Sequence, residues 1–454
     1  MCLSIVRDVL ERVRPERMVD RAWPVVAPRL ESLPAGGIDL IAAGKGSLGL
    51  TRAILDRLQT KIGRGLVLAP SNATRSEAGR TLEKGIDPGG RVRLRPVEHP
   101  APTQRNVDAA RQVERLIRSA PAAPGRTLLV LLSGGGSAHL TLPMEPLTLE
   151  SIADVSARLM LAGAPIAGLN TVRKHTERLK GGRLAQLADE RYDAVLMLVV
   201  SDVIGDDLSV IASGPCAPDP TTYADAIDVL TRHGLTPADV PNVWSHLASG
   251  VAGDIPETPK PGDRCFDRVH HILIGTNRDA VDGACDSLKR LGVRVDGTRL
   301  GVSGESRTCA KELVHRLVSG SPADTTRAIV WGGETTVNVT DAGGASGIGG
   351  RNQEFALAAA MEIPAGQSTL VLAFGTDGVD GPTDAAGGFA TGDTFDRIRR
   401  AGVDPVRAID GHDSHRALDA AGSLIRTGPT GTNAGDVMVA IRFAEAETHG
   451  EKPA

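Results

Sequence analysis

The sequence predicts an α/β protein with two domains and mainly parallel sheets. Short apolar runs rich in β-branched residues alternate with segments of helical periodicity along nearly the whole chain, the pattern of strand–helix–strand units. The chain has 454 residues, more than one hydrophobic core usually organises. A segment rich in proline and glycine, 249–263, interrupts the alternation and is the best candidate for a linker. We therefore expect domains at 1–255 and 256–454.

The first half of the chain is expected to supply five strands and the helices between them. The run 194–200 is apolar throughout, which is typical of a strand buried on both faces. A helical pattern opens the chain, with Val6, Leu10 and Val13 at helix spacing. The remaining strands are expected at 38–43, 65–69, 92–97 and 127–132, and helices at 104–119, 149–161, 224–232 and up to about 58.

The second half repeats the alternation. Strands are expected at 269–275, 293–300, 328–333, 369–374 and 437–443, and helices at 278–291, at 305–318 and after residue 350. Because strands joined through helices run parallel, the pattern on both sides of 249–263 predicts a second α/β domain with a mainly parallel sheet.

Composition excludes several classes of function. The net charge is −4 with acidic and basic residues interleaved, and aromatics make up 2% of the chain, which argues against nucleic-acid and membrane-surface partners. The five cysteines are scattered without a CxxC pair, so neither a disulfide framework nor a zinc site is indicated. No apolar run approaches the ~20 residues that span a bilayer. We expect a cytoplasmic protein, a monomer or homodimer, that acts on small molecules.

A glycine-rich turn follows the expected strand 38–43. Residues 44–49 read Gly-Lys-Gly-Ser-Leu-Gly, which has the spacing and context of a dinucleotide-binding turn, so a nicotinamide site is one interpretation. Strand 65–69 is followed by Pro-Ser-Asn and not by the acidic residue that would hold a ribose hydroxyl. We favour an anion site in which Lys45 lies at the start of the following helix.

A second glycine-rich turn follows the strand 127–132. Its residues are Ser133, Gly134, Gly135, Gly136 and Ser137. Consecutive glycines let the backbone approach a ligand closely and point successive N–H groups at one anion. The chain contains no G-x-x-x-x-G-K-[ST] sequence, so this is not a Walker A loop. It indicates a phosphate cradle of another kind.

Aspartates follow the buried strand 194–200. Asp202, Asp206 and Asp207 lie in the Ser-Asp-Val-Ile-Gly-Asp-Asp segment 201–207. Open α/β sheets bind ligands outside the carboxyl ends of their strands, where such carboxylates can hold a metal ion. The other interpretation is a turn and helix cap, since aspartate favours both for local reasons.

Polar groups also follow strands in the second half. Glu334 ends one strand, Arg351 and Asn352 open a helix after Gly-Ile-Gly-Gly, and Asp377 lies in a segment in which aspartates alternate with glycines. No EF-hand pattern is present. In contrast, the charged segment 171–183 is expected to be a solvated helix face.

Taken together, these segments resemble the class II glycerate kinases, or glycerate 2-kinases, whose C-terminal part is the MOFRL domain. The matching segments, in order, are AGKGS (43–47), LLSGGGSA (131–138), VRKH (172–175), KGGRLA (180–185), SDVIGDDLSVIASGP and PDPTT (201–222), GGETTV (332–337), GIGGRNQEFAL (347–357), FGTDGVDGPTDAAG (374–387) and TGPTGTN (427–433). His139 departs from the family pattern, which usually has an apolar residue there.

The resemblance implies ATP- and Mg²⁺-dependent phosphorylation of D-glycerate at its C2 hydroxyl, in a cleft between a Rossmann-like N-terminal domain and a smaller MOFRL-type domain. The family's lysine falls on Lys45, its aspartate on Asp202 or Asp206, and its arginine on Arg351. We expect these residues to be catalytic. The phosphate- and substrate-binding set is then Ser133, Gly134, Gly135, Gly136, Ser137, Lys174, Glu334, Asn352 and Asp377, and the metal ligands are Asp202, Asp206 and Asp207.

Two alternatives stay open. A nicotinamide-dependent hydroxypyruvate reductase would use the glycine turn at 44–49, although the acidic ribose-binding residue is missing. A non-catalytic, anion-binding regulator would explain the glycine turns, although not the aspartates at strand ends.

Overall fold

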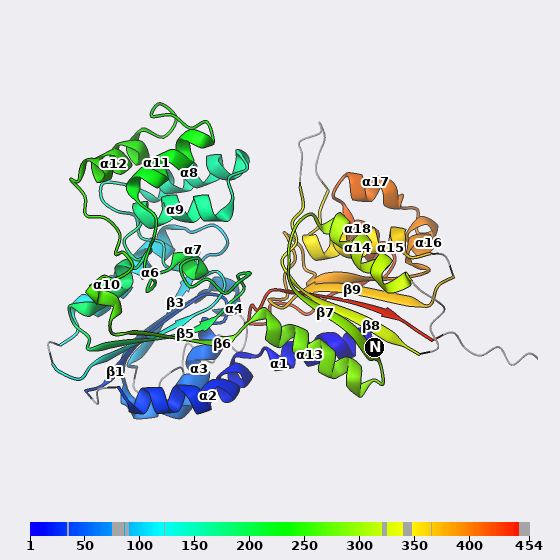
Figure 1. The fold of residues 1–454 in the computed structure, drawn as a ribbon, viewed down its shortest axis with the longest axis horizontal. Helices are drawn as coiled ribbons and strands as arrows, with labels where there is room; N and C mark the ends of the chain where they lie inside the picture. Colours follow the sequence, from blue (N-terminus) through cyan, green and yellow to red (C-terminus); the bar gives the residue numbers. More distant parts are fainter. Residues whose placement is uncertain are drawn as a thin grey trace, which may run out of the picture. The chain divides into compact units, whose positions relative to one another are not determined.

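The chain folds into two compact units. The computed structural model describes residues 1–33, 36–74, 86, 90–121, 123–319, 325–338, 347–364 and 366–444. One unit, here the N-terminal unit, is Pro15–Ile274, and the other, the C-terminal unit, is Met1–Arg14 together with Gly275–Ala454 (Figure 1). This division differs from the expected boundary after residue 255, because the first helix belongs to the C-terminal unit and the chain crosses over only near residue 274.

The N-terminal unit contains a six-stranded sheet in the order β3-β2-β1-β4-β5-β6. Its strands are β1 (Ile38–Ala43), β2 (Ile62–Pro70), β3 (Val92–Val97), β4 (Thr127–Leu132), β5 (Ala194–Val200) and β6 (Val269–Gly275). The pairs β1–β2, β1–β4, β2–β3 and β4–β5 are parallel, so the Rossmann-like, mainly parallel sheet is confirmed. In this strand order, ligands bind where the order reverses, between β1 and β4. Ala43 pairs with Leu132 there, so both glycine turns begin at the same level.

Helices cover both faces of this sheet (Figure 1). A further group, α8, α9, α11 and α12, has its own core that includes Val155, Leu159, Leu230 and Leu247. Threonine caps with capping boxes begin α8 and α11, with Ser151 and Asp225 at the N3 position that glutamate or glutamine usually fills. The helices are α2 (Pro15–Glu31), α3 (Ser47–Leu58), α4 (Ser71–Thr74), α6 (Gln104–Arg118), α7 (Gly136–His139), α8 (Leu149–Leu161), α9 (Ile166–Thr176), α10 (Arg183–Asp189), α11 (Tyr223–Arg232) and α12 (Pro241–Ala252), with 3₁₀ turns η1 (Gln59–Lys61), η2 (Ile211–Ser213) and η3 (Arg264–Phe266).

The expected linker at 249–263 is part of the N-terminal unit. Its first residues complete α12, and Thr258 is 1% exposed. The Glu257 carboxylate lies 2.9 Å from His175 Nε2, and Thr258 Oγ1 donates to Asp219. The prolines and glycines that suggested a linker therefore shape an ordered segment held by buried polar groups.

The C-terminal unit contains a mixed sheet in the order β11-β10-β9-β12-β8-β7. Strand β7 (Arg294–Val302) is parallel to β8 (Arg327–Gly333), whereas β12 (Asp436–Arg442) is antiparallel to both β8 and β9 (Thr369–Gly375). Strand β10 (Gly387–Thr391) is antiparallel to β9 and to β11 (Leu424–Ile425). The prediction of a mainly parallel second sheet is wrong. Strands β7, β8 and β9 do share one direction, but the last strand enters between β8 and β9 in the opposite direction.

Helices cover both faces of the mixed sheet as well (Figure 1). They are α1 (Cys2–Arg12), α13 (Asn277–Arg290), α14 (Ser306–Val318), α15 (Arg351–Glu362), α16 (Thr394–Arg400), α17 (Pro405–Asp410) and α18 (Ser414–Ala420). Helix α1 is tied to this unit because Ser287 Oγ donates to Asp8 and Thr432 Oγ1 to the Val13 carbonyl. Among the described residues, no helix is both long enough and apolar enough to cross a membrane.

Candidate active site

The two glycine turns of the N-terminal unit are bonded to each other. We call Lys45 with Ser133–Ser137 the phosphate cradle. The Lys45 N–H donates to the Gly134 carbonyl at 2.8 Å, and the Gly46 N–H donates to Ser133 Oγ at 2.8 Å. A Cβ on Gly44, which has φ +110°, would lie 2.3 Å from the Ser133 carbonyl oxygen. Only glycine permits this contact, and the Ser133 hydroxyl is used to lock the turns together.

Gly135 in the second turn allows close packing against His99 and Lys45. Gly135 has φ +84°, and a Cβ there would lie 2.9 Å from His99 Cδ2 and 3.5 Å from Lys45 Cγ. Within the described chain, the N–H groups of Gly134 and Gly135 donate to no protein acceptor. Backbone donors next to a lysine side chain can bind the oxygens of a phosphate group.

A buried histidine contacts the first glycine turn. His139 is fully buried, and its Nδ1 lies 2.9 Å from the Gly44 nitrogen, a backbone donor, and 3.0 Å from the Leu68 carbonyl oxygen. Burial, with smaller effects of His99 and Lys45, lowers the pKa of His139 to about 3. In one tautomer the neutral ring accepts the Gly44 N–H through Nδ1, which orients the Lys45 turn; in the other, Nδ1–H donates to the Leu68 carbonyl. The sequence comparison identified His139 only as an unusual residue.

A strained turn lies against the cradle. The Ser137 and Ser213 hydroxyls are 2.7 Å apart, and Ser213 Oγ donates to Asn170 Oδ1 at 3.0 Å. Ala212 and Ser213 both have left-handed backbone conformations, with φ +51° and +59°. Such conformations cost ~1–2 kcal/mol per non-glycine residue and cluster at functional sites. The turn is held because the N–H groups of Gly181 and Gly182 donate to the carbonyls of Ser213 and Gly214.

Three aspartates follow β5, within the segment 201–207. Asp207 is exposed, and its Oδ1 accepts the Ser209 N–H at 2.8 Å, the turn-forming role of an aspartate. Asp206 is half-buried with φ +54°, and Asp202 is half-buried next to the buried Ser201. The described residues contain no group of three or more His, Cys, Asp or Glu side chains that could hold a metal. The assignment of Asp202, Asp206 and Asp207 as metal ligands stays a prediction.

The charged segment 171–183 is not a solvated face, and that prediction is wrong. Lys174 is 4% exposed and its Nζ lies 3.3 Å from Asp219. Lys180 is likewise buried, with its Nζ 2.6 Å from Glu177, and burial lowers the pKa of Lys180. Buried charges persist only when they are paired, and here each has its carboxylate. Lys174 is therefore occupied by Asp219 in this structure, which weakens its expected role in substrate binding.

A second cluster, the acidic cluster, lies in the C-terminal unit and comprises Glu334, Arg351, Asp380 and Asp436. Arg351 Nε and Nη2 donate to Asp436 at 2.5 and 3.0 Å, and Nη1 lies 2.8 Å from Glu334. Burial opposes the charge of the guanidinium, but the carboxylates of Asp436, Glu334 and Asp380 raise the pKa of Arg351. The Arg351 guanidinium, which was expected to be catalytic, binds the chain's own carboxylates in this structure.

Asp380 is buried at the start of α15. Its carboxylate accepts the N–H groups of Asn352 at 3.1 Å and Gln353 at 2.8 Å, which is the contact that a helix N-terminus offers an anion. Burial, together with the nearby Asp436, raises the pKa of Asp380 to about 6. The Asn352 amide also faces Asp380, at 3.4 Å, so its expected contact with a ligand stays a prediction.

Asp377 faces the same space as Asp436. A Cβ on Gly375, between the two, would lie 3.1 Å from Asp377 Oδ1 and 3.2 Å from Asp436 Oδ1. Asp377 Oδ1 also accepts the Val379 N–H at 3.1 Å. Because Asp436 pairs with both Gly333 and Gly375, the start of β12 completes the polar group at the carboxyl ends of β8 and β9.

The structure thus gathers the expected residues in two groups, one in each unit. Lys45 and the Ser133–Ser137 turn meet in the N-terminal unit, and Glu334, Arg351, Asn352 and Asp377 meet in the C-terminal unit. The expected location of the active site between the domains stays a prediction. Residues that the sequence reasoning did not assign to a site are His99, His139, Asn170, Ser213, Asp380 and Asp436.

Two family models match the chain. The model described as "Domain of unknown function (DUF4147)" matches residues 1–248, and the model of the MOFRL family matches residues 327–436. The first covers more than half of the chain.

Relatives match over nearly their whole length. A D-glycerate 2-kinase from Thermotoga maritima is 34% identical over 97% of this chain and 97% of its own. A putative hydroxypyruvate reductase from Agrobacterium vitis is 32% identical over 97% of this chain and 96% of its own. Among solved structures, that of a glycerate kinase from Thermotoga maritima matches with a TM-score of 0.77 and 33% identity, over 97% of this chain and 98% of that one.

Proposed function

Because this chain belongs to the glycerate kinase family, formed by a DUF4147 domain and a MOFRL domain, we propose that it phosphorylates D-glycerate with ATP at the C2 hydroxyl. The products are 2-phosphoglycerate and ADP. The observation that carries the proposal is the phosphate cradle, in which two glycine turns present backbone N–H groups beside Lys45 at the point where the strand order reverses.

Phosphoryl transfer requires positioning and charge neutralisation more than covalent chemistry. The C2 hydroxyl oxygen attacks the γ-phosphorus, the bond to the leaving ADP oxygen breaks, and the hydroxyl proton passes to a base. Lys45 neutralises charge on the transferring phosphoryl group, and the N–H groups of Gly134 and Gly135 bind its oxygens. Asp202 or Asp206 orients the hydroxyl. Arg351 and Asp377 contact the substrate, glycerate.

Magnesium is expected to accompany the nucleotide. Mg²⁺ is usually held by one or two carboxylates plus substrate phosphates and not by an all-protein cage. Single carboxylates such as Asp202 and Asp206 fit that role, and the described residues contain no larger acidic ligand group. The ion supplies charge neutralisation at the phosphate oxygens when bound.

A nicotinamide-dependent reductase is the second candidate, because one relative is named a putative hydroxypyruvate reductase. Two local features disfavour it. Strand β2 ends at Pro70 and is followed by Ser71 and Asn72, which cannot replace the acidic ribose ligand. In the dinucleotide fingerprint, the third glycine lets the helix approach a strand. Here a Cβ on Gly49 would instead lie 2.7 Å from Pro15 Cγ in α2.

Two assays on the purified wild-type protein test the proposal. We expect ADP formation that depends on both D-glycerate and Mg²⁺, and no oxidation of NADH in the presence of hydroxypyruvate. NADH oxidation without ADP formation would favour the reductase. Tight binding of ATP or glycerate without turnover of either would favour the non-catalytic regulator.

A further inference from the structure

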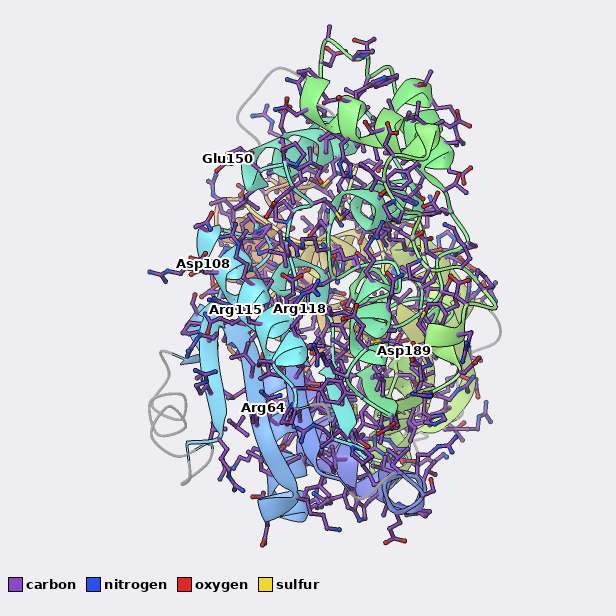
Figure 2. The ribbon with its side chains drawn as sticks, turned by 90° about the vertical axis from the view of Figure 1, so that its left-hand side faces the viewer. Arg64, Asp108, Arg115, Arg118, Glu150 and Asp189 are labelled. Carbon is purple, nitrogen blue, oxygen red and sulfur yellow. The ribbon has the colours of Figure 1, made fainter. Side chains whose placement is uncertain are left out.

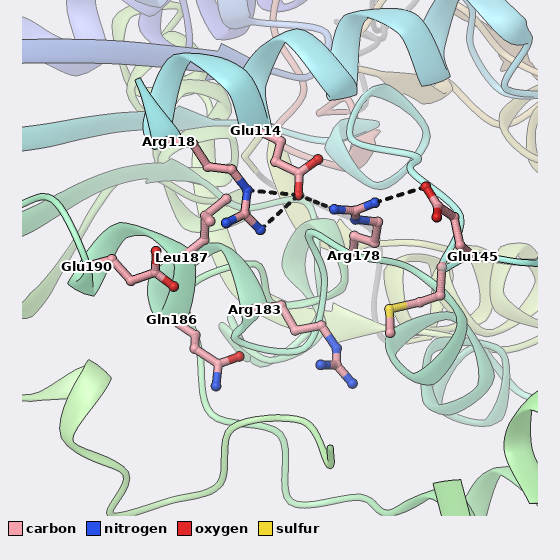
Figure 3. A pocket seen from close by; sticks show the side chains of 9 residues that line it. Glu114, Arg118, Glu145, Arg178, Arg183, Gln186, Leu187 and Glu190 are labelled. Atoms are coloured by element: carbon pink, nitrogen blue, oxygen red, sulfur yellow. Dashed lines mark hydrogen bonds and ion pairs between the residues drawn. The ribbon is translucent and has the colours of Figure 1, made fainter. Parts of the chain in front are cut away.

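A polar cavity opens in the N-terminal unit between α6 and α10. We call it the arginine cavity. It measures about 400 Å³, within the size range of small-molecule sites. Figure 2 shows Arg118 on α6 and Asp189 at the end of α10 on the same face of the molecule, and Figure 3 shows the lining from close by. The lining residues are Glu114, Arg118, Met144, Glu145, Arg178, Arg183, Gln186, Leu187 and Glu190.

The lining has three arginines and three glutamates, so the placement of the charges matters more than their sum. The Glu114 carboxylate is largely buried and is shared by Arg118 at 3.2 Å and Arg178 at 2.5 Å. Two guanidinium groups are thus neutralised by one carboxylate. Glu145 approaches Arg178 only to 3.6 Å, and its side chain is 90% exposed. Glu145 can therefore turn into solvent at little cost.

Arg183 has no carboxylate partner among the described residues. Its Nη2 donates to the Tyr223 hydroxyl and the Pro256 carbonyl, at 3.1 and 3.2 Å, and its Nε is buried without a hydrogen-bond partner in the described chain. Figure 3 shows Arg178 and Arg183 on one side of the cavity and Glu190 on the other. Guanidinium groups with free donors in a cavity favour carboxylate and phosphate ligands, which they bind through pairs of hydrogen bonds.

We propose that the arginine cavity binds a small organic or inorganic polyanion, such as a polycarboxylate or a phosphate, and that its occupancy is sensed by the phosphate cradle. The ligand's anionic groups contact Arg118, Arg178 and Arg183, and Glu145 turns outward. This is a site separate from the cradle, and binding there does not depend on the reaction proposed above.

The physical connection runs through the backbone between two of the arginines. Arg178 and Arg183 flank Gly181 and Gly182, whose N–H groups donate to the Ser213 and Gly214 carbonyls at 3.0 and 2.7 Å. Ser213 Oγ in turn lies 2.7 Å from Ser137 Oγ in the cradle. A ligand that fixes both arginines restrains the short glycine segment between them, and thereby the strained turn that contacts the cradle.

Calorimetric titration of the full-length protein with citrate, and separately with inorganic phosphate, tests the site. We expect binding that Arg118→Gln and Arg183→Gln each weaken at least about tenfold, or ~1.4 kcal/mol. The matched control is Arg111→Gln, because Arg111 lies on the same helix with a similar carboxylate pair, to Asp108, and does not line the cavity. Arg118→Gln is the safer variant for folding, since Glu114 keeps Arg178.

The outcomes separate this site from the cradle. If Lys45→Ala abolishes binding of the anion and the two cavity variants do not, the anion binds at the cradle and the proposal is wrong. Absence of binding tighter than a Kd of about 1 mM, in both titrations, would also overturn it. The coupling has its own readout: citrate or phosphate should slow hydrogen exchange at the Gly181 and Gly182 amides in wild type and not in Arg183→Gln. Unchanged exchange in wild type would refute the coupling.

Discussion

The phosphate cradle and the acidic cluster use opposite chemistry at the ends of their strands. The cradle has uncharged backbone donors, hydroxyls and one half-buried lysine. The acidic cluster has a guanidinium surrounded by carboxylates, and one of these, Asp380, has its pKa raised to about 6 by burial and by Asp436. The first group offers the N–H groups of Gly134 and Gly135, which donate to no acceptor in the described chain. The second already holds its charges in balance, so a ligand there has to replace or extend existing ion pairs.

Because of this difference, we expect substitutions in the two units to affect different properties of the protein. Substitution of the cradle's lysine should change the rate of phosphoryl transfer more than stability, because Lys45 is only half-buried. Substitutions in the acidic cluster should change stability and its pH dependence first, because its charges satisfy one another in a buried setting. The following predictions test that contrast, beginning with the largest expected effect.

Lys45→Ala should lower kcat by about 10²–10³-fold, or ~2.7–4 kcal/mol, the usual loss when one donor to a transition-state charge is removed. Steady-state kinetics with D-glycerate and ATP measure the effect, and chemical denaturation should show an unchanged unfolding free energy. Lys61→Ala is the matched control, because Lys61 is an exposed lysine of the same unit. Near-wild-type turnover of Lys45→Ala would contradict the assignment of the cradle.

The second prediction concerns pH and Asp380. Its pKa is about 6 in the folded protein against an ordinary value of 3.8, so its contribution to stability is fully present below the ordinary value and is lost as the pH rises through about 6. The difference corresponds to ~3 kcal/mol. Unfolding free energies of Asp380→Asn and wild type should therefore shift relative to each other by up to this amount, in favour of the variant, between about pH 4 and pH 7. A difference that does not change with pH would contradict the raised pKa.

Asp436→Asn should lower the unfolding free energy by ~1–3 kcal/mol at neutral pH, because it leaves Arg351 without its buried charged partner. The estimate lies below the range for fully buried pairs because the Arg351 side chain is 35% exposed. Glu334→Gln is the matched variant. It removes the other carboxylate on the same guanidinium, but Glu334 is 45% exposed, so the loss should stay below ~1 kcal/mol. Equal losses in the two variants would show that burial does not decide the strength of these pairs.

Gly136→Ala should have the smallest effect, and it should be reversible by a second substitution. A Cβ at Gly136 would lie 2.9 Å from the Cβ of Ala212, only slightly closer than ordinary contacts allow, so the loss should be about 1 kcal/mol, the lower end of the cost of overpacking. Ala212→Gly removes that contact and relieves a left-handed alanine. Denaturation and steady-state kinetics of the two single variants and the double variant measure the coupling. If the double variant is no better than Gly136→Ala, the contact with residue 212 is not the cause of the loss.

Much of the fold could be predicted from the sequence because its strands are short apolar runs with clear ends. Strands β1, β3, β4, β5 and β6 and helix α8 have the predicted bounds. The second sheet could not be predicted in full, because apolar runs specify strands and not their neighbours. Strand β12 lies between β8 and β9 in the opposite direction, which places Asp436, at the start of β12, among residues at the ends of the other two.

The candidate site was predictable to the extent that it follows parallel strands. Lys45 and the Ser133–Ser137 turn come directly after neighbouring strands β1 and β4, so their proximity follows from the topology. The burial of Lys174 was not predictable, since its partner Asp219 lies far along the chain and a charged run resembles a solvated helix. His139 and Ser213 were missed for a similar reason: each acts through a contact between distant segments.

The position of the phosphate in the reaction product tests the central claim most directly. Wild-type protein is incubated with ATP, Mg²⁺ and D-glycerate, and the product is examined by phosphorus NMR. We expect a phosphorylated glycerate whose proton-coupled phosphorus signal is a doublet, because C2 carries one hydrogen, whereas phosphate on the C3 oxygen would give a triplet from two hydrogens. Phosphate on the C3 oxygen would contradict the proposed regiochemistry, and the absence of any phosphorylated glycerate would contradict the assignment of the protein as a glycerate 2-kinase.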